Sequence, residues 1–137
     1  MSYALSFTQA PSVRRGRSGL IALWVVQIGL AGMFLLAGGS KLLGAPAMVA
    51  LFNTIGIGQW FRYVTGLIEV GSALALLVPS IAVFGALALV PTMIGAVATE
   101  LFLVGDSAVP PAVLLLGAVG VVWARRHQLL SARPIAR

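Results

Sequence analysis

Cysteine is absent from this chain of 137 residues, and histidine occurs once, as His127. Without cysteine the chain can form no disulfide, thiolate metal site or thiol relay of its own. A single histidine also excludes haem ligation by two histidines of one chain. The sequence therefore predicts no metal site and no intrinsic cofactor.

Charged residues are also scarce. They make up 9% of the chain, whereas soluble domains carry about 25%. Hydrophobic residues make up 60% of the chain, and its mean hydropathy is +1.05. A chain of this composition cannot cover its apolar surface by folding alone. We therefore expect the lipid bilayer to be its solvent.

The net charge of +6 is concentrated at the two ends of the chain. The segment between the ends has a net charge of −1. The terminal basic residues are Arg14, Arg15, Arg17, Arg125, Arg126, Arg133 and Arg137. Basic flanks on hydrophobic spans indicate membrane topology. No basic patch interleaved with aromatic residues accompanies them, so no nucleic-acid partner is expected.

Four apolar runs approach the roughly 20 residues that cross a bilayer. They cover residues 20–43, 62–78, 81–104 and 109–124. The predicted fold is therefore all-α, an integral membrane four-helix bundle of residues 20–124. Residues 1–19 and 125–137 are predicted to be basic tails, and the positive-inside rule places both in the cytoplasm. An even number of spans agrees with this multi-pass topology in the cell membrane.

The linker between the first two spans is not a plain loop. Met48, Leu51, Phe52 and Ile55 recur in it at helical spacing, but the segment is too short to cross the membrane. It predicts a short interfacial or re-entrant helix, ended by glycines at positions 56 and 58.

Four charged residues fall in the predicted outer half of the membrane. Glu69 lies seven residues after Arg62, which is about 10 Å deeper at 1.5 Å per residue. Lys41 lies near the end of the first span, and Glu100 lies within about two turns of the outer end of the third. Each residue belongs to a stripe of small or polar residues at helical spacing, so we expect the four side chains to share an interior.

This cluster has two interpretations. A carboxylate inside hydrocarbon is rarely retained without a partner or a task. The favoured interpretation is therefore a polar pocket, open toward the outer leaflet, in which Lys41, Arg62, Glu69 and Glu100 contact a lipophilic small molecule. The alternative is an ion-pair network that only fixes the register of the helices. Gln27, a single amide in the first span, is expected to bond a neighbouring helix.

Several short motifs resemble the DoxX-like family of small four-helix membrane proteins. They are AGGSKL at 37–42, FNTIGI at 52–57, GLIE at 66–69, and AVATELF at 96–102 followed by GD at 105–106. The resemblance covers about residues 20–125 and implies a membrane four-helix bundle. The polar positions of the family correspond to Lys41 and Glu69. Relatives often have histidine at the third-helix position, where this chain has Glu100, which argues against an imidazole-based role.

The resemblance also implies an accessory role, because some members accompany a thiosulfate:quinone oxidoreductase or methylamine utilisation systems. The first hypothesis is a membrane subunit that binds a quinone or similar isoprenoid near a redox enzyme partner. The chain has no redox-active residue, so the electrons would belong to the ligand or the partner.

Two other hypotheses belong to different classes. The chain could be a small enzyme in which Glu69 and Glu100 act as acid and base in an isomerisation or epoxide opening on a lipophilic substrate. Lys41 or Arg62 would then stabilise developing negative charge. It could also be a purely structural membrane subunit. A homo-oligomer fits the glycine-rich faces, but the pattern gives no number of copies.

Overall fold

The computed structural model describes residues 16–131 of the chain. Every regular element in this range is a helix. The order is α1 (Arg17–Leu42), α2 (Pro46–Ile55), α3 (Gln59–Leu76), α4 (Ala82–Thr99), the π-helix η1 (Glu100–Val104), α5 (Val109–Arg125) and α6 (His127–Ser131). The predicted all-α class is confirmed. The outer parts of both predicted tails lie outside the described residues.

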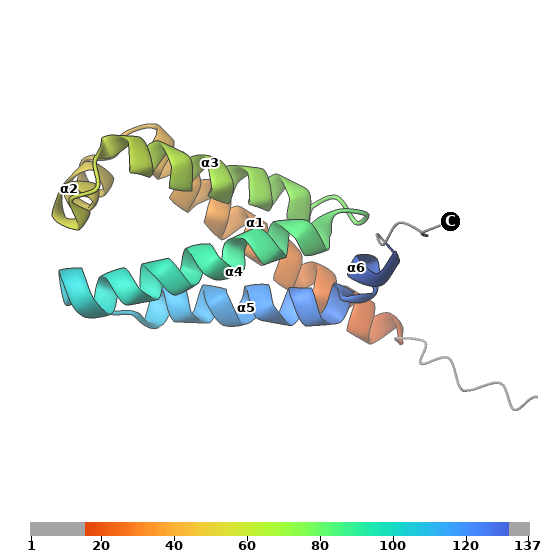
Figure 1. Ribbon diagram of the computed structural model, residues 1–137. Helices are drawn as coiled ribbons and strands as arrows, with labels where there is room; N and C mark the ends of the chain where they lie inside the picture. The colour runs from red at the N-terminus through yellow and green to blue at the C-terminus, as the bar shows by residue number, and fades with distance from the viewer. Residues whose placement is uncertain (1–15, 132–137) are drawn as a thin grey trace, which may run out of the picture.

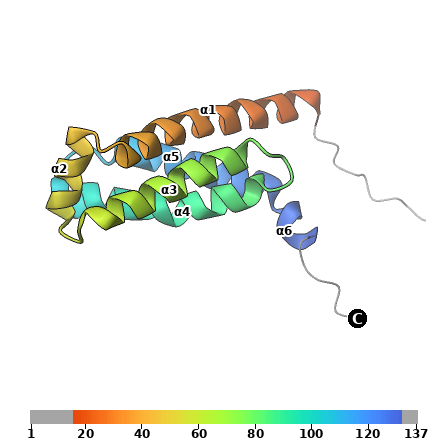
Figure 2. The ribbon, with the colours of Figure 1, turned by 90° about the horizontal axis from the view of Figure 1, so that it is seen from above.

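The long helices α1, α3, α4 and α5 run side by side (Figure 1). α1 packs chiefly on α3, α3 on α4, and α4 on α5, whereas α1 and α5 meet along a sparser seam. α2 lies across one end of the molecule, beside η1, and we call this the α2 end. The start of α1, the turn between α3 and α4, and α6 lie at the opposite end, the α6 end (Figure 2).

Glycine and proline fix the bounds of α2. The helix begins with Pro46 in its first turn and ends at Gly56, which has a φ of 79°. Proline fits a first helical turn, and glycine adopts a left-handed φ without the strain that a Cβ would cause. The predicted short helix is therefore present between α1 and α3. Its position at the membrane interface stays a prediction.

Glycines bring the backbones of neighbouring helices into contact. A Cβ at Gly38 in α1 would lie 2.9 Å from the carbonyl oxygen of Gly66 in α3. A Cβ at Gly85 in α4 would lie 2.7 Å from the carbonyl oxygen of Ser72 in α3. Small residues at such crossings are typical of helices packed in a bilayer. The buried core beside them consists of Leu30, Ala31, Phe34, Ala73, Leu76, Ala86, Leu89, Met93, Ala118 and Val121.

The outer faces of the long helices are apolar. Leu36 in α1, Leu67 in α3 and Leu116 in α5 have exposed fractions of 71%, 62% and 71%. Large apolar surfaces of this kind mark contact with a membrane or another protein. Within the part of the chain that the structure describes, α1 and the segment Ala82–Val104 are long and apolar enough to cross a membrane. The crossings by α3 and by the shorter α5 stay predictions.

Candidate functional site

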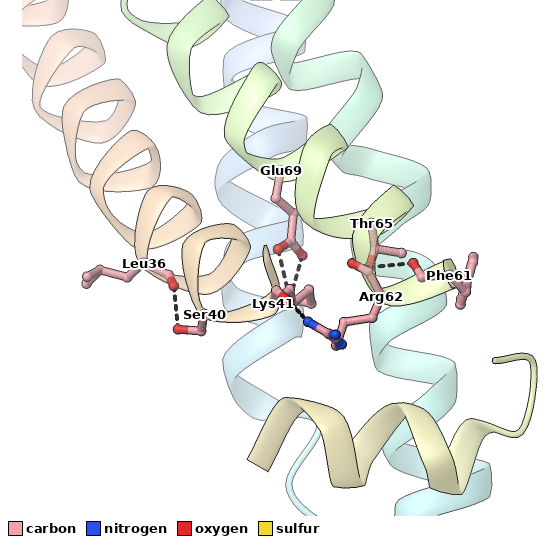
Figure 3. A network of polar contacts seen from close by, with 7 residues as sticks. All are labelled: Leu36, Ser40, Lys41, Phe61, Arg62, Thr65 and Glu69. Atoms are coloured by element: carbon pink, nitrogen blue, oxygen red, sulfur yellow. Dashed lines mark hydrogen bonds and ion pairs between the residues drawn. The ribbon is translucent and has the colours of Figure 1, made fainter. Parts of the chain in front are cut away.

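Lys41 of α1 and Glu69 of α3 form an ion pair near the α2 end (Figure 3). Lys41 Nζ donates to Glu69 Oε2 at 2.8 Å and to Oε1 at 3.0 Å. The Glu69 side chain is 3% exposed and that of Lys41 is 14% exposed. Both carboxylate oxygens are therefore occupied by one cation from the neighbouring helix.

The pair lies next to the closest approach of α1 and α3. Lys41 follows Gly38 by three residues, and Glu69 follows Gly66 by three residues. Residues three apart lie on the same side of a helix, about one turn from each other. Each charged side chain therefore extends from the turn beside a contact glycine, which lets a short bridge join the two helices.

Arg62 lies beside the pair and binds the end of α1 (Figure 3). Its Nη1 donates to the carbonyl oxygen of Lys41, and its Nε donates to Gln59 Oε1 at 2.7 Å. Its guanidinium carbon lies 4.3 Å from the ring centroid of Tyr63. The last carbonyl groups of a helix have no partner within the helix. Arg62 therefore acts as a cap on α1.

Gln59 extends this polar chain to α2. Its Nε2 donates to the carbonyl oxygen of Val49 at 3.0 Å and to Asn53 Oδ1 at 2.8 Å. The hydrogen bonds thus run from α1 through Arg62 and Gln59 to α2. They hold the short helix across the end of α3.

Glu100 is not joined to this network. It is the first residue of η1, and its Oε2 is buried without a hydrogen-bond partner in the part of the chain that is described. Leaving a buried acceptor unsatisfied is costly, and π-helical turns are frequent at functional sites. The structure thus brings Lys41, Arg62 and Glu69 together, and within the described residues no hydrogen bond joins Glu100 to them.

Comparison with known protein families agrees with the motifs in these helices. The sequence model of the DoxX-like family matches residues 25–123, a range that contains Lys41, Glu69 and Glu100. The chain belongs to the DoxX-like family. No curated protein and no solved structure matched it. Family membership and the apolar outer faces together make the chain a small membrane protein.

A second polar group lies at the α6 end of this DoxX-like protein. Gln27 of α1 is fully buried, and its Nε2 donates to the carbonyl oxygen of Leu76 at the end of α3, at 2.7 Å. Its Oε1 accepts from Nε of Arg125 in α5, also at 2.7 Å. Gln27 therefore bonds neighbouring helices as expected.

The sequence predicts Arg125 in the C-terminal tail, because its charge follows the last apolar run. It is instead the last residue of α5 and is buried. Its Nη1 lies 3.5 Å from the carbonyl oxygen of Pro79 in the α3–α4 turn. Gln128 of α6 donates to the same carbonyl through Nε2 and accepts from the backbone nitrogen of Val83 at 3.3 Å. This group ties α1, α5 and α6 to that turn.

Replacing Gln27 with Leu is expected to lower the free energy of unfolding by about 1–3 kcal/mol, because buried polar partners lose their hydrogen bonds. SDS-induced unfolding in mixed micelles, followed by circular dichroism, measures the change. Ser40→Ala is the matched control, because within the described residues its hydroxyl bonds only the Leu36 carbonyl of its own helix. Equal losses in the two variants would contradict the linking role of Gln27.

Proposed function

We propose that this DoxX-like protein is a four-helix transmembrane bundle whose two ends lie in the cytoplasm. The start of α1 and the end of α5 are at the same end of the molecule, as an even number of crossings requires. Arg17 and Arg126 are exposed at this end, and basic residues favour the cytoplasmic side. On this topology the α2 end faces outward, and the Lys41–Glu69 pair lies in the outer half of the membrane.

We further propose that the α2 end binds a lipophilic molecule with a hydroxyl group, of the quinol or isoprenoid-alcohol class. The observation that carries this proposal is the buried Oε2 of Glu100, which has no partner in residues 16–131. Lys41 already occupies both oxygens of Glu69. Glu100 is therefore the carboxylate with an open acceptor for a ligand hydroxyl.

The surroundings of Glu100 suit a ligand that arrives through lipid. Leu101 and Phe102 follow it on η1 and have exposed fractions of 59% and 82%. These side chains can contact an apolar tail while the hydroxyl reaches the carboxylate. The chain supplies binding and orientation, and any electrons belong to the ligand or to a redox enzyme partner.

Glu100→Gln is expected to weaken binding of a short-chain ubiquinol analogue about tenfold, because a hydrogen bond to a charged acceptor is stronger than one to a neutral amide. Titration of purified protein in nanodiscs under reducing conditions, followed by calorimetry, measures the affinity. The oxidised quinone has no hydroxyl to donate and is expected to bind more weakly than the quinol.

Asp106→Asn is the matched control, because Asp106 is exposed in the loop after η1 and its Oδ1 accepts from the backbone nitrogen of Ser107. It is expected to bind the analogue as the wild type does. Equal affinities in the Glu100→Gln and Asp106→Asn variants would contradict the assignment. Absence of binding to both the quinol and farnesol, an isoprenoid alcohol, would contradict the ligand class.

A purely structural role is the second candidate, and the closed Lys41–Glu69 pair favours it. A pair that occupies both carboxylate oxygens and joins two helices at their contact needs no ligand to account for it. Acid–base catalysis gains no such support, because both oxygens of Glu69 already accept from Lys41. The Glu100→Gln titration separates the two candidates, since a structural subunit would bind neither form of the analogue.

A further inference from the structure

A groove of about 500 Å³ lies between α1 and α5 at the α6 end, on the sparse seam of the molecule. Gly19, Ala22 and Val26 line it on α1, and Gly117, Gly120 and Trp123 line it on α5. Added Cβ atoms at Gly19 and Gly120 would meet nothing within 4 Å, so the groove is open beside both. The lining spans seven residue steps of α1, which is about 10 Å, or a third of the hydrocarbon core.

Arg126 stands at the mouth of this groove. It is exposed, and its guanidinium carbon lies 4.2 Å from the ring centroid of Trp123, which lines the groove. Its Nη1 donates to the carbonyl oxygen of Trp123 at 2.7 Å. Arg126 forms no ion pair within residues 16–131.

No acidic side chain of the chain is available to neutralise Arg126. The acidic residues are Glu69, Glu100 and Asp106. Glu69 is paired with Lys41. Glu100 and Asp106 follow α4 at the α2 end, at the opposite end of the molecule from the groove. The mouth of the groove is therefore basic, while its walls are apolar.

We infer that this groove binds an anionic phospholipid, with an acyl chain between α1 and α5 and its phosphodiester beside Arg126. Basic residues close to the membrane surface attract anionic lipids, about fivefold in affinity for each Lys or Arg. Tryptophan is enriched at the level of the lipid headgroups, where Trp123 then lies. The inference does not depend on the ligand proposed at Glu100, which lies at the opposite end.

A second copy of the chain is the competing occupant, because faces rich in small residues suit helix packing. Copies inserted in the same direction and related by a twofold axis place identical surfaces against each other. Arg126 of one copy would then face Arg126 of the other, with no acidic side chain nearby. A phosphodiester supplies the opposite charge, so the charges at the mouth favour lipid.

Quenching of Trp123 by brominated lipids tests the inference. The double variant Trp24→Phe, Trp60→Phe leaves Trp123 as the single tryptophan. This protein is reconstituted into phosphatidylcholine vesicles with increasing fractions of brominated phosphatidylglycerol or brominated phosphatidylcholine. We expect the apparent affinity at Trp123 to be at least fivefold higher for phosphatidylglycerol.

Variants in the same background assign the preference to the groove. Arg126→Gln is expected to lower the preference about fivefold, whereas Arg126→Lys keeps the charge and most of the preference. Gly120→Leu fills the groove and is expected to lower quenching by both lipids. Gly71→Leu is its matched control, because Gly71 is an exposed glycine of α3 whose added Cβ would also meet nothing within 4 Å.

Three outcomes would overturn the inference. One is equal quenching by the two lipids in the protein with Arg126. Another is an unchanged preference in Arg126→Gln together with unchanged quenching in Gly120→Leu, because the selectivity would then come from the charge of the whole protein. The third is a dimer in native mass spectrometry whose Trp123 is shielded from both lipids, which would assign the groove to a second copy.

Discussion

Lys41→Met is expected to lower the free energy of unfolding by about 3–5 kcal/mol, the loss typical when one partner of a buried ion pair is removed. The variant leaves the Glu69 carboxylate, 3% exposed, without the cation that binds both of its oxygens. SDS-induced unfolding in mixed micelles measures the loss. Glu69→Leu is expected to cost less, because Lys41 is 14% exposed and near the end of its helix, where its flexible chain can reach the interface.

The double variant Lys41→Met, Glu69→Leu is the control that separates a missing charge from damaged packing. Replacing a whole buried pair by apolar residues is often neutral or stabilising, so we expect it to recover most of the loss. Losses that add in the double variant would contradict this account. The double variant should still bind the ubiquinol analogue if Glu100 binds the ligand, because no hydrogen bond joins the Lys41–Glu69 pair to Glu100 within the described residues.

The apolar runs predicted the helices closely, and the reason is physical. Expected limits of 20–43 and 109–124 compare with Arg17–Leu42 for α1 and Val109–Arg125 for α5. A bilayer offers the backbone no hydrogen bonds, so a long apolar run becomes a helix. Depth and helical spacing also predicted three charged neighbours for Glu69, and one of them, Lys41, is its partner.

The position of Glu100 could not be predicted in the same way. Helical spacing gives the face of a helix on which a residue lies, but not which helices become neighbours. The packing order is α1, α3, α4 and α5, so α3 separates α4 from α1. Glu100, at the end of α4, therefore belongs to the surroundings of α2 and does not reach Lys41 by any hydrogen bond. The π-helical turn that begins at Glu100 has no signature in the residue pattern.

The burial of Arg125 could not be predicted from the sequence, for a different reason. A charge just after an apolar run is an ordinary topology signal, and nothing in its sequence neighbourhood distinguishes a buried arginine from one in a tail. Its partner Gln27 is 98 residues away in the sequence and meets it only after α1 and α5 have packed. Contacts of this kind depend on the tertiary arrangement.

Gly38→Ala is expected to lower the free energy of unfolding by about 1–3 kcal/mol, the range for overpacking a close contact. The new Cβ would lie 2.8 Å from Val70 Cγ2 and 2.9 Å from the Gly66 carbonyl oxygen. A valine methyl group can turn aside, but the backbone of α3 cannot, so α1 must move outward. The same SDS titration measures the loss.

Gly39→Ala is the matched control, because it is the next residue of α1 and its added Cβ would meet nothing within 4 Å. It is expected to leave stability unchanged or raise it by up to about 1 kcal/mol, since alanine favours a helix over glycine. Equal effects of the two substitutions would contradict the close contact between α1 and α3.

Gly38→Ala also tests whether helix contact and ion pair act together. Moving α1 away from α3 stretches the bridge between Lys41 and Glu69, whose shorter contact is 2.8 Å. Part of the loss caused by the added methyl group then comes from the weakened pair. Sites that share an interaction do not add, so we expect a smaller loss for Gly38→Ala in the Lys41→Met, Glu69→Leu background. An identical loss in both backgrounds would show that the close contact at Gly38 holds α1 and α3 together independently of the Lys41–Glu69 ion pair.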